Sequence, residues 1–237
     1  MNRTKIEWCD YTLNPVKGLC PMHCKTPNGY EYCYAAGERG LYKRFKWNPE
    51  IRYDSKAFNG LVTLKKPSRI FVGSTFELFG EWVRHEWLED VFMLVRAYPQ
   101  HTFIFLTKLP EELLRWSPFP SNCHIGVSVT NQEQYDKAIL YLKDIQASVK
   151  FLSFEPLLNH IILDNKPSLV EAGITWIICG QCTPVRKWTM PKVEWIKEIV
   201  EACDGTGMPV FQKKDNLQPL LTGQWAGWKL RQEFPRV

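Results

Sequence analysis

The 237-residue sequence lacks any uninterrupted apolar run of the roughly 18 residues that a membrane-spanning helix needs. Its first residues carry Arg3, Lys5 and Glu7 where a secretory signal peptide would carry its apolar stretch. The chain also lacks internal repeats, low-complexity tracts and linker-like segments. With 45% hydrophobic and 23% charged residues, we expect a single globular domain over residues 1–237, located in the cytoplasm and without a membrane partner.

The net charge of +5 is concentrated in the N-terminal third of the chain. Residues 1–69 contain 13 Lys and Arg against 6 Asp and Glu, a net charge of +7, which leaves −2 for the remainder. Tyr42, Phe45, Trp47 and Tyr53 are interleaved with these cations. Such a segment favours a nucleotide or nucleic acid as the substrate, because cations attract phosphates and aromatic rings stack on bases. The alternative is a solvated basic face whose aromatic residues belong to the core.

A recurring unit, in which an apolar strand is followed by a helix, organises the rest of the chain. Strands are expected at about 12–16, 69–73, 102–107, 124–129, 149–154, 175–179 and 209–212, and helices at 85–98, 110–116, 130–145 and 191–203. The pattern Thr130-x-x-Glu133 is a capping box that predicts the start of the third helix. Apolar strands that alternate with helices indicate a parallel sheet. About six or seven such units predict an α/β fold, a complete or partial TIM-like (β/α) barrel, with a doubly wound open sheet as the alternative.

Polar side chains follow most of these strands at the point where each strand ends. In parallel barrels these ends converge on one mouth, so we expect the polar residues to gather there. Each residue taken alone is also explained as a helix cap or a loop residue. The set is Ser74, Glu77, Thr107, Lys108, Ser128, Thr130, Ser153, Glu155, Cys179, Gln181, Gln212, Lys213 and Asp215.

Three of the eight cysteines, Cys20, Cys24 and Cys33, come from one loop after the first expected strand. Closely spaced cysteines in a chain without a secretion signal typically bind metal rather than form disulfides. A 4Fe-4S cluster held by three cysteines leaves one iron open for chemistry, whereas structural zinc takes four closed ligands. The rival hypothesis is therefore a zinc-stabilised nucleic-acid-binding protein without catalysis, in which His23 supplies the fourth ligand.

The cysteine loop resembles the C-x3-C-x2-C loop of radical-SAM enzymes. The matching residues are Gly18-Leu-Cys20-Pro-Met-His-Cys24 and Glu31-Tyr32-Cys33-Tyr34-Ala35, with the aromatic Tyr32 directly before the third cysteine. Eight residues separate Cys24 from Cys33, and removal of residues 25–30 would restore the usual spacing. Because Pro27-Asn28-Gly29 is a strong turn signal, we expect the extra segment to bulge out while the flanking cysteines still meet one cluster.

Nearly end to end, the chain is similar to the phage-associated three-Cys-motif family of radical-SAM-like proteins. The stretches that carry the similarity are 5–8, 14–16, 33–35, 45–49, 72–74, 77–79, 106–108, 126–129, 153–157 and 213–217. The resemblance implies a 4Fe-4S cluster on Cys20, Cys24 and Cys33, with S-adenosylmethionine bound to the open iron. Reductive cleavage of this cofactor would then give a radical that abstracts hydrogen from a substrate, so an electron donor is an expected partner.

Five further residues are expected to bind the cofactors. Tyr32 would belong to the cluster loop, and Glu77 would pair with the methionine ammonium group. Ser128 and Thr130 would bond the ribose or the carboxylate, and Glu155 would take a hydroxyl or a substrate amine.

Two lysines at strand ends, Lys108 and Lys213, are expected to contact an anionic substrate. We expect the remaining cysteines to be buried thiols rather than ligands, since free cysteine is among the most buried residue types. They are Cys9, Cys123, Cys179, Cys182 and Cys203.

A third interpretation of the whole chain, beside the radical-SAM enzyme and the zinc-stabilised protein, is a barrel that has kept the scaffold and lost the cluster.

Overall fold

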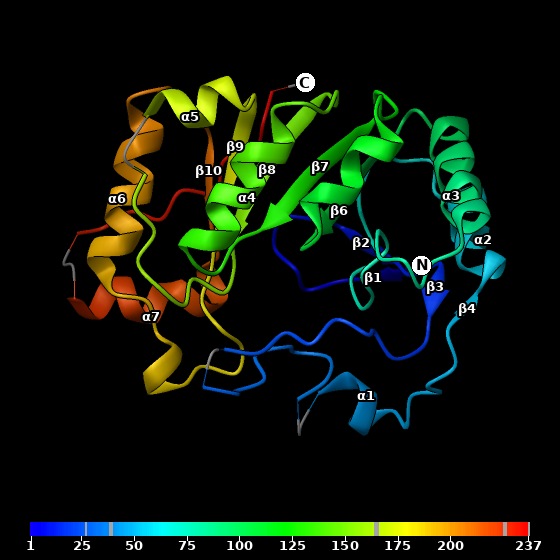
Figure 1. Cartoon of the computed structure of the whole chain (residues 1–237), viewed down its shortest axis with the longest axis horizontal. Coiled ribbons are helices and arrows are strands. Elements are labelled where there is room, and N and C mark those ends of the chain that lie inside the picture. The colour runs from blue at the N-terminus through cyan, green and yellow to red at the C-terminus, as the bar shows by residue number, and fades with distance from the viewer. Residues whose placement is uncertain (27, 38–39, 164–165, 225–226, 237) are drawn as a thin grey trace. The chain divides into compact units, whose positions relative to one another are not determined.

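The computed structural model describes residues 1–26, 28–37, 40–163, 166–224 and 227–236 (Figure 1). Contacts divide the chain into two compact units. The first comprises Met1–Thr107 and Pro120–Cys123, and the second comprises Lys108–Phe119 and His124–Val237. Each unit is described by itself, and the single domain over residues 1–237 stays a prediction.

The first unit is built around parallel strands. Its elements are β1 (Asn2–Arg3), β2 (Tyr11–Leu13), β3 (Val16–Lys17), α1 (Leu41–Arg44), β4 (Arg52–Tyr53), η1 (Ser55–Phe58), α2 (Asn59–Thr63), β5 (Arg69–Val72), α3 (His85–Ala97) and β6 (Thr102–Thr107). The strand order is β1-β2-β5-β6. β1 pairs antiparallel with β2, whereas β2, β5 and β6 run parallel, and β3 pairs separately with β4. Helix α3 packs on β6, where the rings of Phe92 and Phe105 lie 5.4 Å apart.

The second unit has the same α/β character. Its elements are η2 (Pro110–Trp116), β7 (Cys123–Ser128, with Cys123 itself in the first unit), α4 (Gln132–Leu142), β8 (Val149–Phe154), α5 (Lys166–Glu171), β9 (Ile174–Cys179), η3 (Lys187–Thr189), α6 (Val193–Asp204), β10 (Val210–Gln212) and α7 (Lys214–Gln224). The strand order is β7-β8-β9-β10, and all three pairings are parallel.

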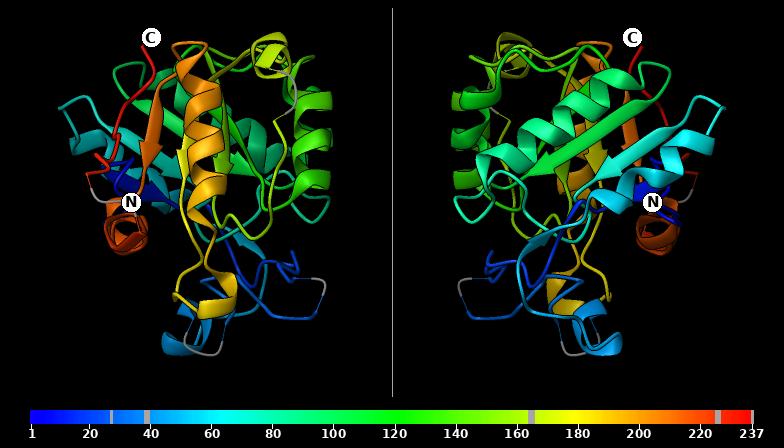
Figure 2. Two further views of the ribbon diagram at one scale, coloured as in Figure 1. Left: turned by 90° about the vertical axis from the view of Figure 1, so that its left-hand side faces the viewer. Right: turned by 90° about the vertical axis from the view of Figure 1, so that its right-hand side faces the viewer.

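Helices α4 and α6 cover one face of these strands (Figure 2). Tyr135 of α4 stacks on Phe154 with ring centroids 6.4 Å apart. Cys203 of α6 lies near enough to Cys179 for the two thiols to interact electrostatically. Phe154 and Cys179 are partners in the β8–β9 register, and such partners point to the same face of a sheet. Ser153, one residue earlier on β8, therefore points to the other face.

The expectation of an α/β fold with parallel strands is confirmed. The strands at 102–107 and 149–154 have the expected bounds, and the other predicted strands differ from theirs by one to three residues at one or both ends. The apolar runs form strands because both faces of the sheet are covered, and every residue of β7 is buried. Within each unit, the described strands lie in a linear order, so the complete or partial barrel stays a prediction. No described helix is both long and apolar enough to cross a membrane.

The start predicted for the helix after β7 was wrong by one residue. Asn131 is the N-cap of α4, and its side chain accepts a hydrogen bond from the Gln134 N–H at 2.9 Å. The Gln134 side chain in turn accepts bonds from the Thr130 N–H at 2.8 Å and the Thr130 hydroxyl at 2.9 Å. Asparagine competes well with threonine for the cap position, and a glutamine at the third helical position completes the reciprocal bonding.

Replacement of Asn131 tests this cap. Asn131→Ala should lower the free energy of unfolding by about 1 kcal/mol, because the Gln134 N–H loses its acceptor. Asn131→Ser is the matched control, since serine caps nearly as well and should leave stability almost unchanged. Urea denaturation of the three proteins measures the difference, and equal stability of the alanine and serine variants would contradict the assignment.

Candidate active site

The extra segment of the cysteine loop closes on itself. Lys25 and Glu31 form an antiparallel bridge, and the Tyr32 N–H donates to the Cys24 carbonyl at 3.0 Å. The turn is completed by the Thr26 N–H bonding to the Tyr30 carbonyl at 2.8 Å. The segment therefore bulges out as expected and returns Tyr32, and with it Cys33, to the side of Cys24.

Two residues of the predicted turn can be placed individually. Gly29 has φ +83, a left-handed conformation that glycine adopts without strain. A Cβ atom at this position would meet no heavy atom within 4 Å. Glycine is therefore favoured here by the backbone conformation and not by a lack of room for a side chain. Pro27 lies outside the described residues.

Tyr42 ties the cysteine loop to the end of β5. The Cys20 N–H donates to the Tyr42 hydroxyl at 3.3 Å, and that hydroxyl donates to the Thr75 carbonyl at 2.7 Å. The Tyr42 N–H donates to the Ala35 carbonyl at 3.0 Å, two residues beyond the third cysteine. One residue, through its hydroxyl and its backbone N–H, thus connects both ends of the cysteine loop with the segment after β5.

The three thiols surround this phenol. Burial raises the pKa of Tyr42 above its ordinary value, and the charges of Cys20, Cys33 and Cys24 raise it further. Cys24 is buried, and the other two cysteines are half-buried. The three sulfurs consequently belong to one electrostatic environment.

The Cys20 thiol is the best-defined of the three. Burial raises its pKa, and the N–H groups of Glu77 and Met22 oppose that rise by donating to the sulfur. The Glu77 N–H lies 3.4 Å from the Cys20 Sγ. The charge of Cys33 raises the pKa of Cys20 further, so ionising both thiols is costly unless a cation lies between them.

Among the described residues, no group of three or more His, Cys, Asp or Glu side chains is arranged to hold one metal ion. This finding concerns a single ion, which draws all of its ligands to one centre about 2.3 Å from each sulfur. A cubane cluster spreads its thiolates over different irons. The cluster on Cys20, Cys24 and Cys33 therefore stays a prediction.

Glu77 joins the cysteine loop to the ends of β5 and β6. Its backbone touches Cys20, and its carboxylate is 7% exposed. The Glu77 Oε1 accepts bonds from the Thr107 hydroxyl at 2.8 Å and the Phe79 N–H at 3.2 Å. Gly73 has φ +78 and lets the chain turn back directly after β5. The sequence pointed to Glu77, and the structure brings this carboxylate beside a cysteine.

Glu155, Gly180 and Lys213 follow three neighbouring strands of the second unit. The backbone hydrogen bonds between these parallel strands continue past the strand ends. The Gly180 N–H donates to the Phe154 carbonyl at 3.0 Å, and the Lys213 N–H donates to the Cys179 carbonyl at 3.0 Å. The Lys213 ammonium pairs with the Glu155 Oε1. A Cβ at Gly180 would lie 2.9 Å from Glu155 Cδ and 3.1 Å from Lys213 Cδ, so the ion pair crosses over this glycine. The charge of Lys213 is thus balanced by Glu155.

Ser128 and Thr130 end in different environments. Ser128 is buried and is the register partner of Ser153, whose buried hydroxyl has no hydrogen-bond partner among the described residues. The Thr130 hydroxyl donates to Gln134, which fixes it within the start of α4. The roles of Ser128, Thr130 and Glu155 toward a cofactor stay predictions.

Two buried amides at this edge of the second unit bond to each other's backbone. The Asn216 Nδ2 donates to the Gln181 carbonyl at 2.9 Å, and the Gln181 Nε2 donates to the Asn216 carbonyl. This reciprocal pairing fixes the orientation of both amides. Their Gln181 Oε1 and Asn216 Oδ1 atoms are buried without a partner among the described residues, so they present two acceptors to a hydrogen-bond donor.

The aromatic residues of the basic segment do not act as one stacking surface. Tyr42 is buried, and Trp47 packs against it with ring centroids 5.6 Å apart. Tyr53 stacks on Trp87 at 6.0 Å. Phe45 is the exception and is 62% exposed. Sequence reasoning left Tyr42 either to base stacking or to the core, and it missed the tethering role of this residue because its partners at Cys20 and Thr75 are distant in sequence.

A comparison of two tyrosine variants tests the tether. Tyr42→Phe should lower the free energy of unfolding by about 1–3 kcal/mol, because the Thr75 carbonyl and the Cys20 N–H both lose a partner. The matched control is Tyr53→Phe, whose hydroxyl makes no hydrogen bond among the described residues, and it should be close to neutral. Chemical denaturation measures both, and equal losses would refute the tether.

The sequence was compared with known protein families and with curated proteins. The family described as protein of unknown function DUF5131 matches residues 3–229. No curated protein matches the sequence. The phage association implied by the sequence resemblance stays a prediction.

Similar solved structures include a spore photoproduct lyase double mutant with bound AdoMet and dinucleoside spore photoproduct, at 14% identity and a TM-score of 0.43. That match covers 98% of this chain and 65% of the lyase chain. A single mutant of the lyase matches at 14% identity and a TM-score of 0.43, with 97% and 64% covered. This chain thus spans about 65% of the length of the first lyase. Because the family match extends over nearly the whole sequence, the chain belongs to the DUF5131 family.

Proposed function

We propose that this protein is a radical-SAM-type enzyme, in which Cys20, Cys24 and Cys33 hold a 4Fe-4S cluster and S-adenosylmethionine binds beside it. The proposed substrate class is a nucleotide or nucleic acid. The single observation that carries the proposal is the closed hairpin between Cys24 and Tyr32, which removes the six extra residues from the path between the second and third cysteines.

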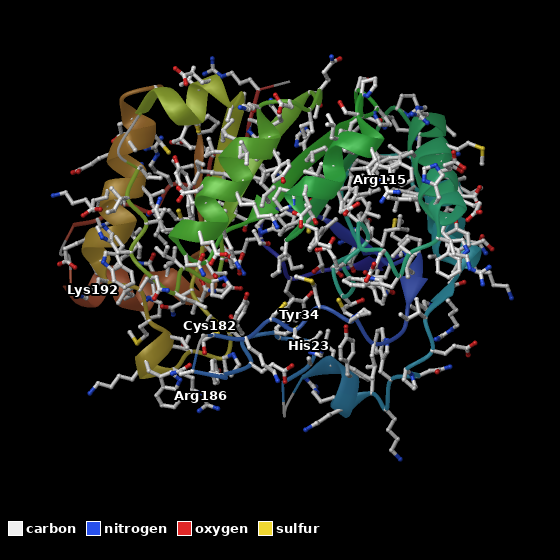
Figure 3. All side chains as sticks on the ribbon, in the orientation of Figure 1. His23, Tyr34, Arg115, Cys182, Arg186 and Lys192 are labelled. Carbon is white, nitrogen blue, oxygen red and sulfur yellow. The ribbon has the colours of Figure 1, made fainter. Side chains whose placement is uncertain are left out.

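The donor set fits such a cluster. Three thiols share one partly buried environment, and the Glu77 N–H donates to the Cys20 sulfur. Hydrogen bonds to ligand sulfurs and exclusion of solvent are the means by which proteins tune iron-sulfur clusters. The zinc alternative needs His23 as a fourth ligand, but this residue is exposed while the neighbouring Cys24 is buried (Figure 3).

A cluster held by Cys20, Cys24 and Cys33 would supply the electron for reductive cleavage of S-adenosylmethionine, which is the source of hydrogen-abstracting chemistry in this enzyme class. The protein's own residues orient and shield the reacting groups. Glu77 offers a carboxylate to the methionine ammonium group, and Thr107 and Phe79 preset its orientation through Oε1. Tyr32 is buried and packs directly beside Cys33, which keeps water from that part of the loop.

In the second unit, the polar strand ends supply the remaining proposed contacts. Ser128 offers a hydroxyl to a ribose or a carboxylate, and Thr130 retains the acceptor capacity of its oxygen. Glu155 takes a hydroxyl or amine of the bound molecule, while Lys213 holds that carboxylate in place. The unsatisfied oxygens of Gln181 and Asn216 suit an amino group, such as the exocyclic amine of a nucleobase.

Reconstitution with iron and sulfide under anaerobic conditions tests the cluster. The wild-type protein should turn brown with an absorbance band near roughly 400 nm, as expected of this cofactor class. Cys20→Ala, Cys24→Ala and Cys33→Ala should each lose most of this absorbance. Cys9→Ser is the control and should keep it, because Cys9 lies outside the loop. A colourless wild-type protein that contains one zinc ion would remove the enzyme proposal.

The role of Glu77 is tested by turnover. With dithionite and S-adenosylmethionine, the wild-type protein should release 5'-deoxyadenosine. Glu77→Gln should reduce that release by about tenfold or more, because a neutral amide loses the charge-assisted bond to the ammonium group. The iron-sulfur absorbance should stay intact, since glutamine keeps the oxygen that Thr107 and Phe79 bond. Unchanged turnover in this variant would show that Glu77 does not bind the cofactor.

A further inference from the structure

The connection between β9 and α6 has an unusual charge pattern. No acidic residue occurs between Glu171 and Glu194, whereas Arg186, Lys187 and Lys192 fall within that interval. The same connection contains η3 and extends beyond the end of the strands (Figure 2). It is therefore a locally cationic loop in a unit that is not basic elsewhere.

The apolar residues of this loop are exposed. Trp188 is 69% exposed, Val185 is 48% exposed and Met190 is 37% exposed. Scattered single apolar residues on a surface are ordinary, but three within six positions, including a tryptophan, concentrate exposed apolar side chains on one short loop, and tryptophan is enriched at binding surfaces.

The loop is nevertheless well anchored. Thr189 is buried, and its N–H and its hydroxyl donate to the Arg186 carbonyl at 3.0 Å and 3.1 Å. Pro191, which follows the exposed Met190 in the sequence, is also buried. These contacts fix the base of the loop, so Trp188 is presented on an ordered turn and its exposure does not result from a loose segment.

The cations of the loop are not neutralised locally. Among the described residues, no carboxylate forms an ion pair with Arg186 or Lys187, whose side chains are exposed. Lys192 lies over the ring of Trp195 at 5.6 Å. The nearby Glu198 pairs with His160 at 2.5 Å, which leaves Glu194 as the one exposed acid at the start of α6. Within the loop itself, Trp188 therefore directly follows two exposed cations that no described carboxylate pairs with.

We propose that the loop over residues 183–192 binds single-stranded nucleic acid, with a base stacked on Trp188 and phosphates on Arg186 and Lys187. An exposed aromatic ring next to two cations without a described carboxylate partner has the composition of sequence-tolerant single-strand binding. A folded protein partner is less well suited, since it would place carboxylates on the cations without requiring a stacked ring. This inference rests on the proposed function for what happens to the bound strand. It deepens that function by narrowing the substrate class to single-stranded nucleic acid.

Fluorescence anisotropy with a labelled oligothymidylate of about 16 nucleotides tests this loop in the full chain, before and after cluster reconstitution. Trp188→Ala should weaken binding by roughly 5- to 150-fold, whereas Trp188→Phe should keep most of the affinity. Arg186→Ala combined with Lys187→Ala should reduce the slope of log affinity against log salt by about 1.4. Lys65→Ala combined with Lys66→Ala is the charge-matched control in the first unit and should have the smaller effect.

Several outcomes would overturn the inference. They are absence of binding by the wild-type protein, unchanged binding by Trp188→Ala, an equal loss in the Lys65 and Lys66 control, and displacement of the oligonucleotide by polyglutamate at equal charge concentration. Binding requires neither cluster nor S-adenosylmethionine. Loss of 5'-deoxyadenosine release with intact binding would therefore refute the proposed function alone, and turnover without oligonucleotide binding would refute this inference alone.

Discussion

The hydrogen bond from the Tyr32 N–H to the Cys24 carbonyl is the contact on which the candidate site depends. It closes the extra hairpin and so brings Cys33 back to the side of Cys24, although eight residues lie between the two cysteines in sequence. Tyr42 then holds Cys20 against the segment after β5, and Glu77 reaches Cys20 from that segment. Without the closed hairpin, the six extra residues would lie on the path between Cys24 and Cys33 and would separate the Cys33 thiol from the other two thiols.

The second unit uses a different constraint to gather polar groups. Parallel strands end at one edge, and their ladder continues far enough to align Glu155, Gly180 and Lys213. The glycine is needed because the ion pair occupies the space above it. The attraction within a charged pair partly withdrawn from water offsets the cost of desolvation only when the geometry is well fixed, so this row is suited to present a defined carboxylate rather than a mobile one.

Sequence periodicity was sufficient for the parallel strands and for helices α3, α4 and α6, because apolar runs such as 149–154 can only be satisfied by burial on both faces. The short elements β1, β3, β4, α1, α2 and α5 were not predicted. Periodicity also failed where the decision depends on a side-chain bond. Thr130 and Asn131 are both acceptable caps, and the position of Gln134 decides between them. Helix α7 was not predicted, since Pro219 lies inside it and interrupts any helical signal. The candidate site was predicted where residues are close in sequence, as for the cysteines, and missed where Tyr42 meets Thr75.

Tyr42 and Trp188 show why composition alone misplaces a binding surface. Both are aromatic residues flanked by lysine and arginine, and the basic N-terminal segment was the stronger candidate by charge. Tyr42 is buried because its hydroxyl finds a donor and an acceptor in segments far along the chain. Trp188 is 69% exposed and lies next to the buried Thr189, which bonds back to the Arg186 carbonyl. The distinction between the buried and the exposed ring lies in these contacts rather than in residue type, which is why the proposed polyanion-binding surface is the loop before α6 rather than the basic N-terminal segment.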